Sequence, residues 1–260
     1  MRVALGVEYD GSRFFGWQVQ PHARSVQQDL EASLGKVANH PLRTVCAGRT
    51  DTGVHAIGQV VHFDSDAQRT ERSWLLGSNV NLPGDVSVVW AKLVADEFHA
   101  RFKAVSRRYR YVILNRETRC SVINQKVTWE REPLDSSKMH AAAQGLAGQH
   151  DFSSFRAVKC QAKHPVRTIY SITVSQSGDL IFLDIIANAF LHHMVRNIAG
   201  VLMSIGRGRK PVSWVSELLE RCDRRVGGVT APADGLYLVA VDYPEEFAIP
   251  TPNSGIILGC

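Results

Sequence analysis

The sequence has few cysteines and no uninterrupted hydrophobic run. Its five cysteines are an odd number, widely spaced and without a C-x-x-C pair, which excludes a disulfide framework and zinc-ligand spacing. The longest apolar stretch, residues 189–205, contains two histidines and an arginine, and charge at bilayer depth is costly. The N-terminal apolar stretch meets an acid at Glu8, too early for a signal peptide. We therefore expect a cytoplasmic protein with no membrane-spanning segment and no bound metal.

Acidic residues are fewer than basic ones. The chain of 260 residues has 30 Lys and Arg against 25 Asp and Glu, and 22 of the cations are arginine. Residues 1–103 are balanced at 11 of each sign, whereas residues 104–260 hold 19 basic and 14 acidic side chains. Arginine binds phosphate through paired hydrogen bonds and stacks on bases, which favours a nucleic-acid partner. A GC-rich genome would produce the same arginine usage whatever the function.

The first hundred residues predict one α+β unit. Alternating apolar residues favour strands, and a Ser-x-x-Gln capping box at Ser25 favours a helix start. The predicted elements are strand 2–9, a helix from Ser25, strands 42–47 and 57–64, helix 72–80 and strand 86–94. The order β-α-β-β-α-β is typical of ferredoxin-like or RRM-like units.

The remainder repeats the theme with insertions. It predicts strands 105–114, 165–175, 180–187 and 236–242 and helices 135–147, 191–206 and 212–222. Since no low-complexity linker separates the parts, we expect two domains, 1–103 and 104–260, that share an interface.

The densest chemical pattern is AGRTDTGVHA at residues 47–56. Small residues surround one carboxylate, Asp51, on a connection between two apolar strands, where functional side chains are often displayed. A tight turn in which Asp51 caps amides and Gly53 takes a positive φ explains the pattern equally well. Asp51-Thr52-Gly53 also matches aspartic proteases, but no second D-T-G supplies the other carboxylate.

Two further segments combine cations with aromatic or apolar stripes. On the strand 105–114, Tyr109 and Tyr111 share one side and Arg108 and Arg110 the other, as in sheets that stack RNA bases; core tyrosines opposite exposed arginines are the alternative. On the helix 191–206, Arg196 lies opposite the apolar face, in the first turns. There a cation gains nothing from the helix dipole, so we expect a carboxylate or phosphate partner unless Arg196 is a plain surface residue.

Taken together, these segments resemble the tRNA pseudouridine synthase A family. The motifs fall in the same order and cover nearly the whole chain, with residues 115–165 contributing least. They are Tyr9-Asp10-Gly11, Gly16-Trp17-Gln18, Ser25-Val26-Gln27, Gly48-Arg49-Thr50-Asp51-x-Gly53-Val54-His55-Ala56, Arg108-Tyr109-x-Tyr111, Phe190-Leu191-x-x-Met194-Val195-Arg196-Asn197 and Gly235-Leu236-Tyr237-Leu238.

The resemblance implies an enzyme that isomerises uridine to pseudouridine at positions 38, 39 and 40 of the tRNA anticodon stem-loop, without a cofactor. It implies two α+β, RRM-like or ferredoxin-like halves whose antiparallel sheets join, with the active site in the cleft between them, and a homodimer that holds tRNA. The competing hypothesis is a non-catalytic two-RRM-like RNA-binding protein. That hypothesis leaves Asp51 unexplained, because an acid in an RNA-binding cleft repels phosphate.

The resemblance also implies roles for single residues. Asp51 matches the catalytic aspartate, whether it attacks C6, attacks C1′ or acts as a base. Tyr109 matches the tyrosine that stacks on the target base, Arg196 the arginine that pairs with the aspartate, and Arg49 the arginine that fills the gap left by a flipped nucleotide. Further phosphate contacts are expected from the basic segment 101–131, which includes Arg108 and Arg110, and from Arg207, Arg209 and Lys210.

Overall fold

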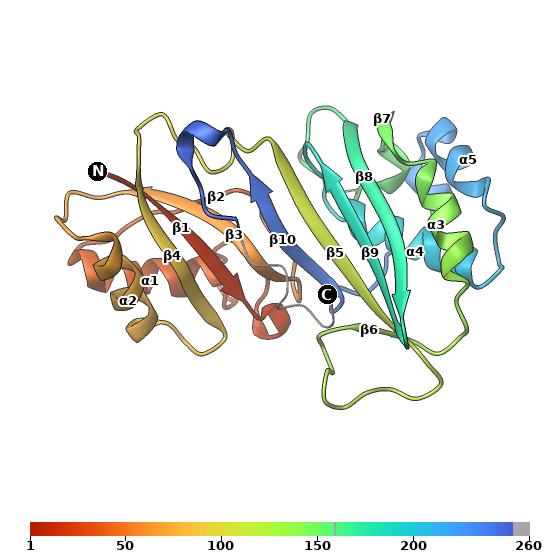
Figure 1. Cartoon of the computed structure of the whole chain (residues 1–260), viewed down its shortest axis with the longest axis horizontal. Helices are drawn as coiled ribbons and strands as arrows, with labels where there is room; N and C mark the ends of the chain where they lie inside the picture. The colour runs from red at the N-terminus through yellow and green to blue at the C-terminus, as the bar shows by residue number, and fades with distance from the viewer. Residues whose placement is uncertain (159, 252–260) are drawn as a thin grey trace. The chain divides into compact units, whose positions relative to one another are not determined.

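The computed structural model describes residues 1–158 and 160–251, which form two compact α+β units (Figure 1). Unit 1 comprises residues 1–107 together with the described residues from Tyr237 onward, and unit 2 comprises residues 108–236. The last strand belongs to unit 1, because it pairs with a strand of that unit.

Unit 1 is a mostly antiparallel sheet with two helices. Strand β1 (Arg2–Tyr9) lies between β3 (His55–Asp64) and β4 (Val86–Val94) and is antiparallel to both. Strand β10 (Leu236–Asp242) adds to the other side of β3 in parallel, and the short β2 (Val45–Cys46) also pairs with β3. The first hundred residues therefore follow the predicted β-α-β-β-α-β order.

The two helices of unit 1 begin where side-chain caps predict. Helix α1 (Val26–Ala38) starts after Ser25, whose Oγ accepts a hydrogen bond from Gln28 N at 3.3 Å, and α2 (Glu71–Asn81) follows Thr70 in the same way. Both helices pack against each other on the same side of the sheet (Figure 1). Their apolar faces and the inner face of the sheet form the core of unit 1.

Unit 2 has the strand order β5-β9-β8-β7 with β6 beside β5. The strands are β5 (Ser106–Asn115), β6 (Thr128–Glu130), β7 (Gly148–Asp151), β8 (Val166–Ser177) and β9 (Leu180–Ala187). The helices are α3 (Ser136–Gln144), α4 (Met194–Gly206) and α5 (Trp214–Arg221). Short 3-10 helices lie at Gly11–Arg13, Ser153–Phe155, Arg224–Val226 and Glu245–Phe247.

The predicted apolar stripe of α4 is confirmed, although the helix begins later than expected. Met194, Ile198, Leu202 and Ile205 are all buried. The preceding His193 has a positive φ of 61° and is the N-cap residue. The helix therefore begins three residues later than predicted. Strands β6 and β7 have too few residues for a periodic pattern and were not predicted.

Two expectations concern absent features. The four cysteines among the described residues, at 46, 120, 160 and 222, are all free thiols, and the fifth cysteine lies outside the described residues. Of the helices in residues 1–158 and 160–251, none has the length and apolar character that crossing a membrane requires.

Candidate active site

Asp51 lies on the loop of residues 48–54 that joins β2 to β3, hereafter the Asp51 loop. The loop turns sharply: Val54 N donates to Asp51 O at 3.1 Å, and Gly53 has a φ of 79°. Its start is held by Gln59 of β3, whose side-chain amide donates to Gly48 O at 2.6 Å. Asp51 itself is half-buried. The loop therefore contains the tight turn predicted around Gly53, and the same turn carries the partly exposed Asp51 carboxylate.

A second segment, residues 9–17, braces the Asp51 loop from the other side. Trp17 N donates to Thr50 O at 3.0 Å, and Gly53 N donates to Phe14 O at 3.3 Å. The hydroxyls of Tyr9 and Thr50 are 2.7 Å apart and buried. Backbone and side-chain contacts thus fix the residues on both sides of Asp51, so the main chain that carries the carboxylate is held in place.

Two glycines make this close approach possible. A Cβ atom on Gly11 would lie 2.0 Å from Val54 O, and one on Gly16 would lie 2.7 Å from Thr50 O. Gly16 also has a φ of 90°, a conformation that side chains disfavour. Sequence analysis identified both glycines only by resemblance; their contact with the Asp51 loop is the physical reason for them.

His55 fastens the far end of the loop. Its side chain is only 2% exposed, its Nδ1 accepts a hydrogen bond from Gly11 N at 3.0 Å, and the same nitrogen lies 3.3 Å from Asp10 Oδ1. The imidazole stacks on Tyr237 of β10 with ring centroids 4.7 Å apart. Burial and the nearby Asp10 carboxylate raise the pKa of Tyr237. The sequence alone did not indicate this contact, because Tyr237 is far along the chain.

Two other groups near the loop differ in character. Arg49 is exposed. Cys46, at the end of β2, is buried, and that burial raises the pKa of its thiol to about 12, despite the opposing charges of Arg49 and Arg101. The thiolate is the nucleophilic form of cysteine, and a thiol with a raised pKa forms little of it. Cys46 is therefore a core residue and not a candidate nucleophile.

In unit 2, the two tyrosines on one side of β5 have different environments. Tyr109 packs edge-on against Phe190, with ring centroids 4.9 Å apart. Tyr111 is fully buried, its hydroxyl lies 2.5 Å from Thr128 Oγ1 and donates to Pro232 O at 2.9 Å, and burial raises its pKa. The predicted alternation is confirmed, but the predicted base-stacking ladder cannot include Tyr111, because it is a core residue.

Arg196 lies in the first turn of α4, as predicted, and is half-buried. Its Nε donates to Ala231 O at 2.9 Å, and its own carbonyl accepts from Ala231 N at 3.1 Å. Gly200, one turn later, lets this segment approach the helix, since a Cβ there would lie 1.8 Å from Val229 O. The residues around 229–231 therefore position the Arg196 guanidinium.

Most of the other predicted RNA-binding arginines have carboxylate partners inside unit 2. Arg110 bonds Asp184 through two nitrogens, at 2.8 and 3.0 Å. Arg207 and Arg209 pair with acids at the end of β6, namely Glu130 and Glu132 respectively. These ion pairs indicate that the three arginines have structural roles. A phosphate group that bound to them would have to share each guanidinium with its carboxylate partner. The buried Nε atoms of Arg108 and of Arg207 both have no hydrogen-bond partner within residues 1–158 and 160–251.

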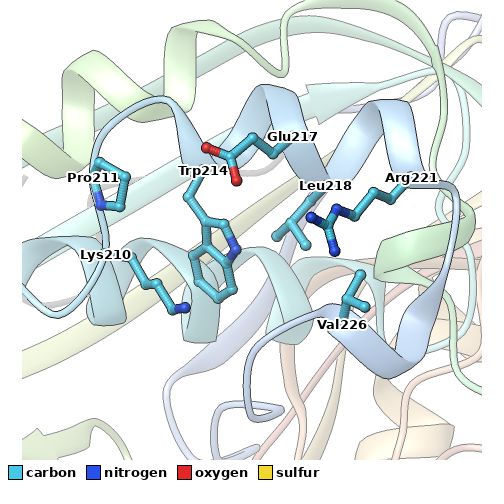
Figure 2. Close-up of a pocket in the computed structure, with 7 residues that line it drawn as sticks. All are labelled: Lys210, Pro211, Trp214, Glu217, Leu218, Arg221 and Val226. Atoms are coloured by element: carbon cyan, nitrogen blue, oxygen red, sulfur yellow. The ribbon is translucent and has the colours of Figure 1, made fainter.

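Lys210 borders a cavity of about 310 Å³ on α5, shown in Figure 2. Its ammonium lies 5.0 Å from the centre of the Trp214 ring. The lining residues are Lys210, Pro211, Trp214, Glu217, Leu218, Arg221 and Val226. Lys210 is the one predicted site residue in this lining, and no residue of the Asp51 loop contributes to it. The cavity is therefore separate from that loop.

Comparison with known proteins gives one consistent assignment. The family model described as tRNA pseudouridine synthase matches residues 6–103 and 142–244. The chain is 55% identical over 254 residues to "tRNA pseudouridine synthase A" of Escherichia fergusonii and of Enterobacter sp. (strain 638), covering 98% of this chain and 94% of each relative. A solved Cbf5–Nop10–Gar1 complex is also similar, but its TM-score of 0.32 at 11% identity, over 90% of this chain and 57% of that one, is too low to add to this.

These matches identify an isomerase that acts on uridines of tRNA. The chain belongs to the tRNA pseudouridine synthase family. The predicted family, activity class and α+β fold are thereby confirmed, and nothing supports the non-catalytic two-RRM-like alternative.

Sequence reasoning missed two residues that hold the Asp51 loop, Gln59 and Arg107. Gln59 is buried within β3 and bonds Gly48; a glutamine directly before the apolar pair Val60-Val61 was the available signal. Arg107 donates to Ala47 O at 3.2 Å, and one cation within a run of arginines carried no signal that separated it from its neighbours.

Proposed function

We propose that this chain converts uridine to pseudouridine at positions 38, 39 and 40 of the tRNA anticodon stem-loop, with Asp51 as the catalytic carboxylate. The reaction breaks the N1–C1′ bond and forms a C5–C1′ bond, while C5 loses a proton and N1 gains one. Substrate and product are isomers, so no electrons are transferred to or from a partner. The observation that carries the assignment is the braced Asp51 loop, within the motif that matches the family.

The geometry of the loop suits this role. A carboxylate that attacks carbon or removes a proton must be held close to its target, and misplacement by about 1 Å can cost about 100-fold in rate. Contacts at Thr50 and Gly53 hold the chain on both sides of Asp51. Neighbouring groups do not compete: the Cys46 thiol stays protonated, and His55 Nδ1 is occupied by the Gly11 amide.

Three arginine and tyrosine side chains complete the proposal, on the strength of the family match. Tyr109 stacks on the target uracil, and its edge-on packing against Phe190 holds the ring in place. Arg196, itself oriented by its bond to Ala231, pairs with the Asp51 carboxylate and orients it. Arg49, exposed beside Asp51, fills the gap in the stem after the uridine flips out. We further propose a cytoplasmic homodimer that holds one tRNA across both subunits.

The decisive experiment compares Asp51→Asn with wild type and with Asp66→Asn, which removes an exposed carboxylate of the same unit. Carbodiimide primer extension maps pseudouridine in tRNA, and filter binding measures tRNA affinity. We expect no modification by Asp51→Asn, affinity within about threefold of wild type, and full activity of Asp66→Asn. Turnover by Asp51→Asn above a trace from deamidation would leave Asp51 as a turn-capping residue.

The proposed role of Arg49 is tested by comparing a target uridine that is base-paired with one that is mismatched. Arg49→Ala should slow modification of a uridine that is paired in the stem more than one that is mismatched, because flipping a paired base costs a few kcal/mol. Rates on two anticodon stem-loops that differ only at the opposing base measure this ratio. Equal impairment on both substrates would assign Arg49 to a phosphate contact or to Asp51 positioning.

A further inference from the structure

The loop of residues 96–105, which follows β4 and is hereafter the Phe102 loop, is anchored by Phe98. This ring is fully buried and packs against Tyr243 and Phe247, with ring centroids 5.1 and 5.3 Å apart. The anchor ties the loop to the core of unit 1.

The backbone of the Phe102 loop is fastened by side chains on both its carbonyl and amide groups. Three carbonyls accept bonds: Phe98 O from Arg2 at 3.0 Å, Ala100 O from Tyr243 at 2.6 Å and Arg101 O from Arg107 at 2.7 Å. Three amides donate to imidazole Nδ1 atoms: Ala100 N to His62 at 3.1 Å, and Arg101 N and Phe102 N to His99 at 3.2 and 3.1 Å. Burial lowers the pKa of His99, which keeps its ring neutral and able to accept.

This fastened loop displays one large ring to solvent. Phe102 is 75% exposed, whereas His99 stacks on it with ring centroids 4.3 Å apart and planes inclined by 29°. The Arg101 guanidinium lies 5.6 Å from the ring centre, and the next residue after Phe102 is the exposed Lys103, whose ammonium lies 5.9 Å from the centre of the Phe247 ring. The two acids of the loop, Asp96 and Glu97, lie near Arg2, whose pKa is raised mainly by its hydrogen bond to Asp64 and to a lesser extent by these two carboxylates. An aromatic ring flanked by cations is the arrangement that binds unpaired nucleotides.

The Phe102 loop is joined directly to the segment that carries Asp51. One Arg107 nitrogen, Nη2, donates both to Arg101 O at 2.7 Å and to Ala47 O at 3.2 Å. Ala47 immediately precedes the Asp51 loop. One RNA stem-loop bound at Asp51 is therefore within reach of Phe102.

We propose that Phe102 is a stacking platform for an unpaired nucleotide of the substrate tRNA, with Arg101 and Lys103 contacting adjacent phosphates. The inference rests on the proposed function and adds a second contact point to it, outside the Asp51 loop. A second copy of this chain is the less suitable occupant, because a two-fold contact centred on this patch would bring Arg101 and Lys103 against their own copies.

The test uses the full chain with three substitutions at one position, Phe102→Ala, Phe102→Leu and Phe102→Trp. Exposed Leu76 of α2 provides the matched control, Leu76→Ala. Stacking on one base corresponds to about 5- to 150-fold in tRNA affinity. We expect losses in that range for the Ala and Leu variants, affinity near wild type for Trp and Leu76→Ala, and similar maximal rates for all at saturating tRNA.

The salt dependence of tRNA affinity separates the stacking contribution of Phe102 from the electrostatic contribution of Arg101. Phe102→Ala should weaken binding equally at all salt concentrations, whereas Arg101→Gln should reduce the slope of log affinity against log salt by about 0.7 to 0.9. Wild-type affinity in Phe102→Ala overturns the proposal, as does full rescue by Leu. A dimer that dissociates in Phe102→Ala, with unchanged affinity per protomer, overturns it in favour of a second copy. An inactive wild-type protein would instead refute the proposed function.

Discussion

Gly16→Ala tests whether the brace around the Asp51 loop supports catalysis. The new methyl group would lie 2.7 Å from Thr50 O, and the backbone would have to keep a φ of 90°. An alanine at positive φ costs about 1 to 2 kcal/mol, and a forced backbone shift costs about 1 to 3 kcal/mol more. The expected destabilisation is therefore about 2 to 5 kcal/mol, which a typical domain survives in part.

The clash can be relieved only by moving Gly16 and Thr50 apart, and Thr50 precedes Asp51. We expect the maximal rate to fall by roughly 10- to 100-fold, with a smaller effect on tRNA affinity. The isomerisation removes the hydrogen from C5, so release of tritium from tRNA containing [5-³H]uridine measures the rate. Urea denaturation measures the free energy of unfolding.

Two matched glycines separate the conformational cost from the clash. Gly178→Ala shares the positive φ, at 56°, but has no atom within 4 Å of the new Cβ, so it should lose about 1 kcal/mol of stability and no activity. Gly11→Ala has the clash without positive φ, 2.0 Å from Val54 O, and should lose activity. The reasoning is refuted if Gly16→Ala is no less stable than Gly178→Ala and turns over at the wild-type rate.

Three more predictions follow from single contacts. Under the proposed function, Arg196→Met should lower the maximal rate by at least about 10-fold and affect binding less, because the Asp51 carboxylate would lose the cation proposed to pair with it; tritium release and filter binding measure the two effects. Arg207→Gln should destabilise folding by about 3 kcal/mol, because it strands a nearly buried glutamate, whereas Lys210→Gln should only flatten the salt dependence of tRNA binding. Burial, together with the neighbouring His99 imidazole and the Arg2 charge, lowers the pKa of His62 to about 4. The stability contributed by its neutral form is complete above pH 6.5 and is lost as the pH falls toward 4, roughly 2 to 3 kcal/mol in urea titrations that use His62→Gln as reference.

Each of these has an opposing outcome. Wild-type rates in Arg196→Met would make that arginine a surface residue. Unchanged stability in Arg207→Gln would show that its ion pair contributes little, and equal pH profiles for wild type and His62→Gln would assign the acid loss to other groups.

Local patterns in the sequence determined most of the secondary structure and drew attention to Asp51, whereas the catalytic role proposed for Asp51 came from the resemblance to a family. The Ser25 cap, the alternation along β1 and β5 and the apolar stripe of α4 each depend on residues within one or two turns or pleats of each other. The same holds for Asp51, which stands out as a carboxylate on a small-residue turn between two apolar strands.

Tertiary structure alone decided how that carboxylate is held and which cations already have partners. The bonds from residues 9–17 to Thr50 and Gly53, the stacking of His55 on Tyr237 and the pairing of Arg207 with Glu130 join residues that are 33 or more positions apart. Tyr109 and Tyr111 share one side of β5, yet they have different neighbours: Phe190 packs edge-on against the first ring, and the hydroxyl of the second contacts Thr128 and Pro232. Such contacts exist only after distant strands have paired, because periodicity places a side chain on a face and does not specify which segment covers it.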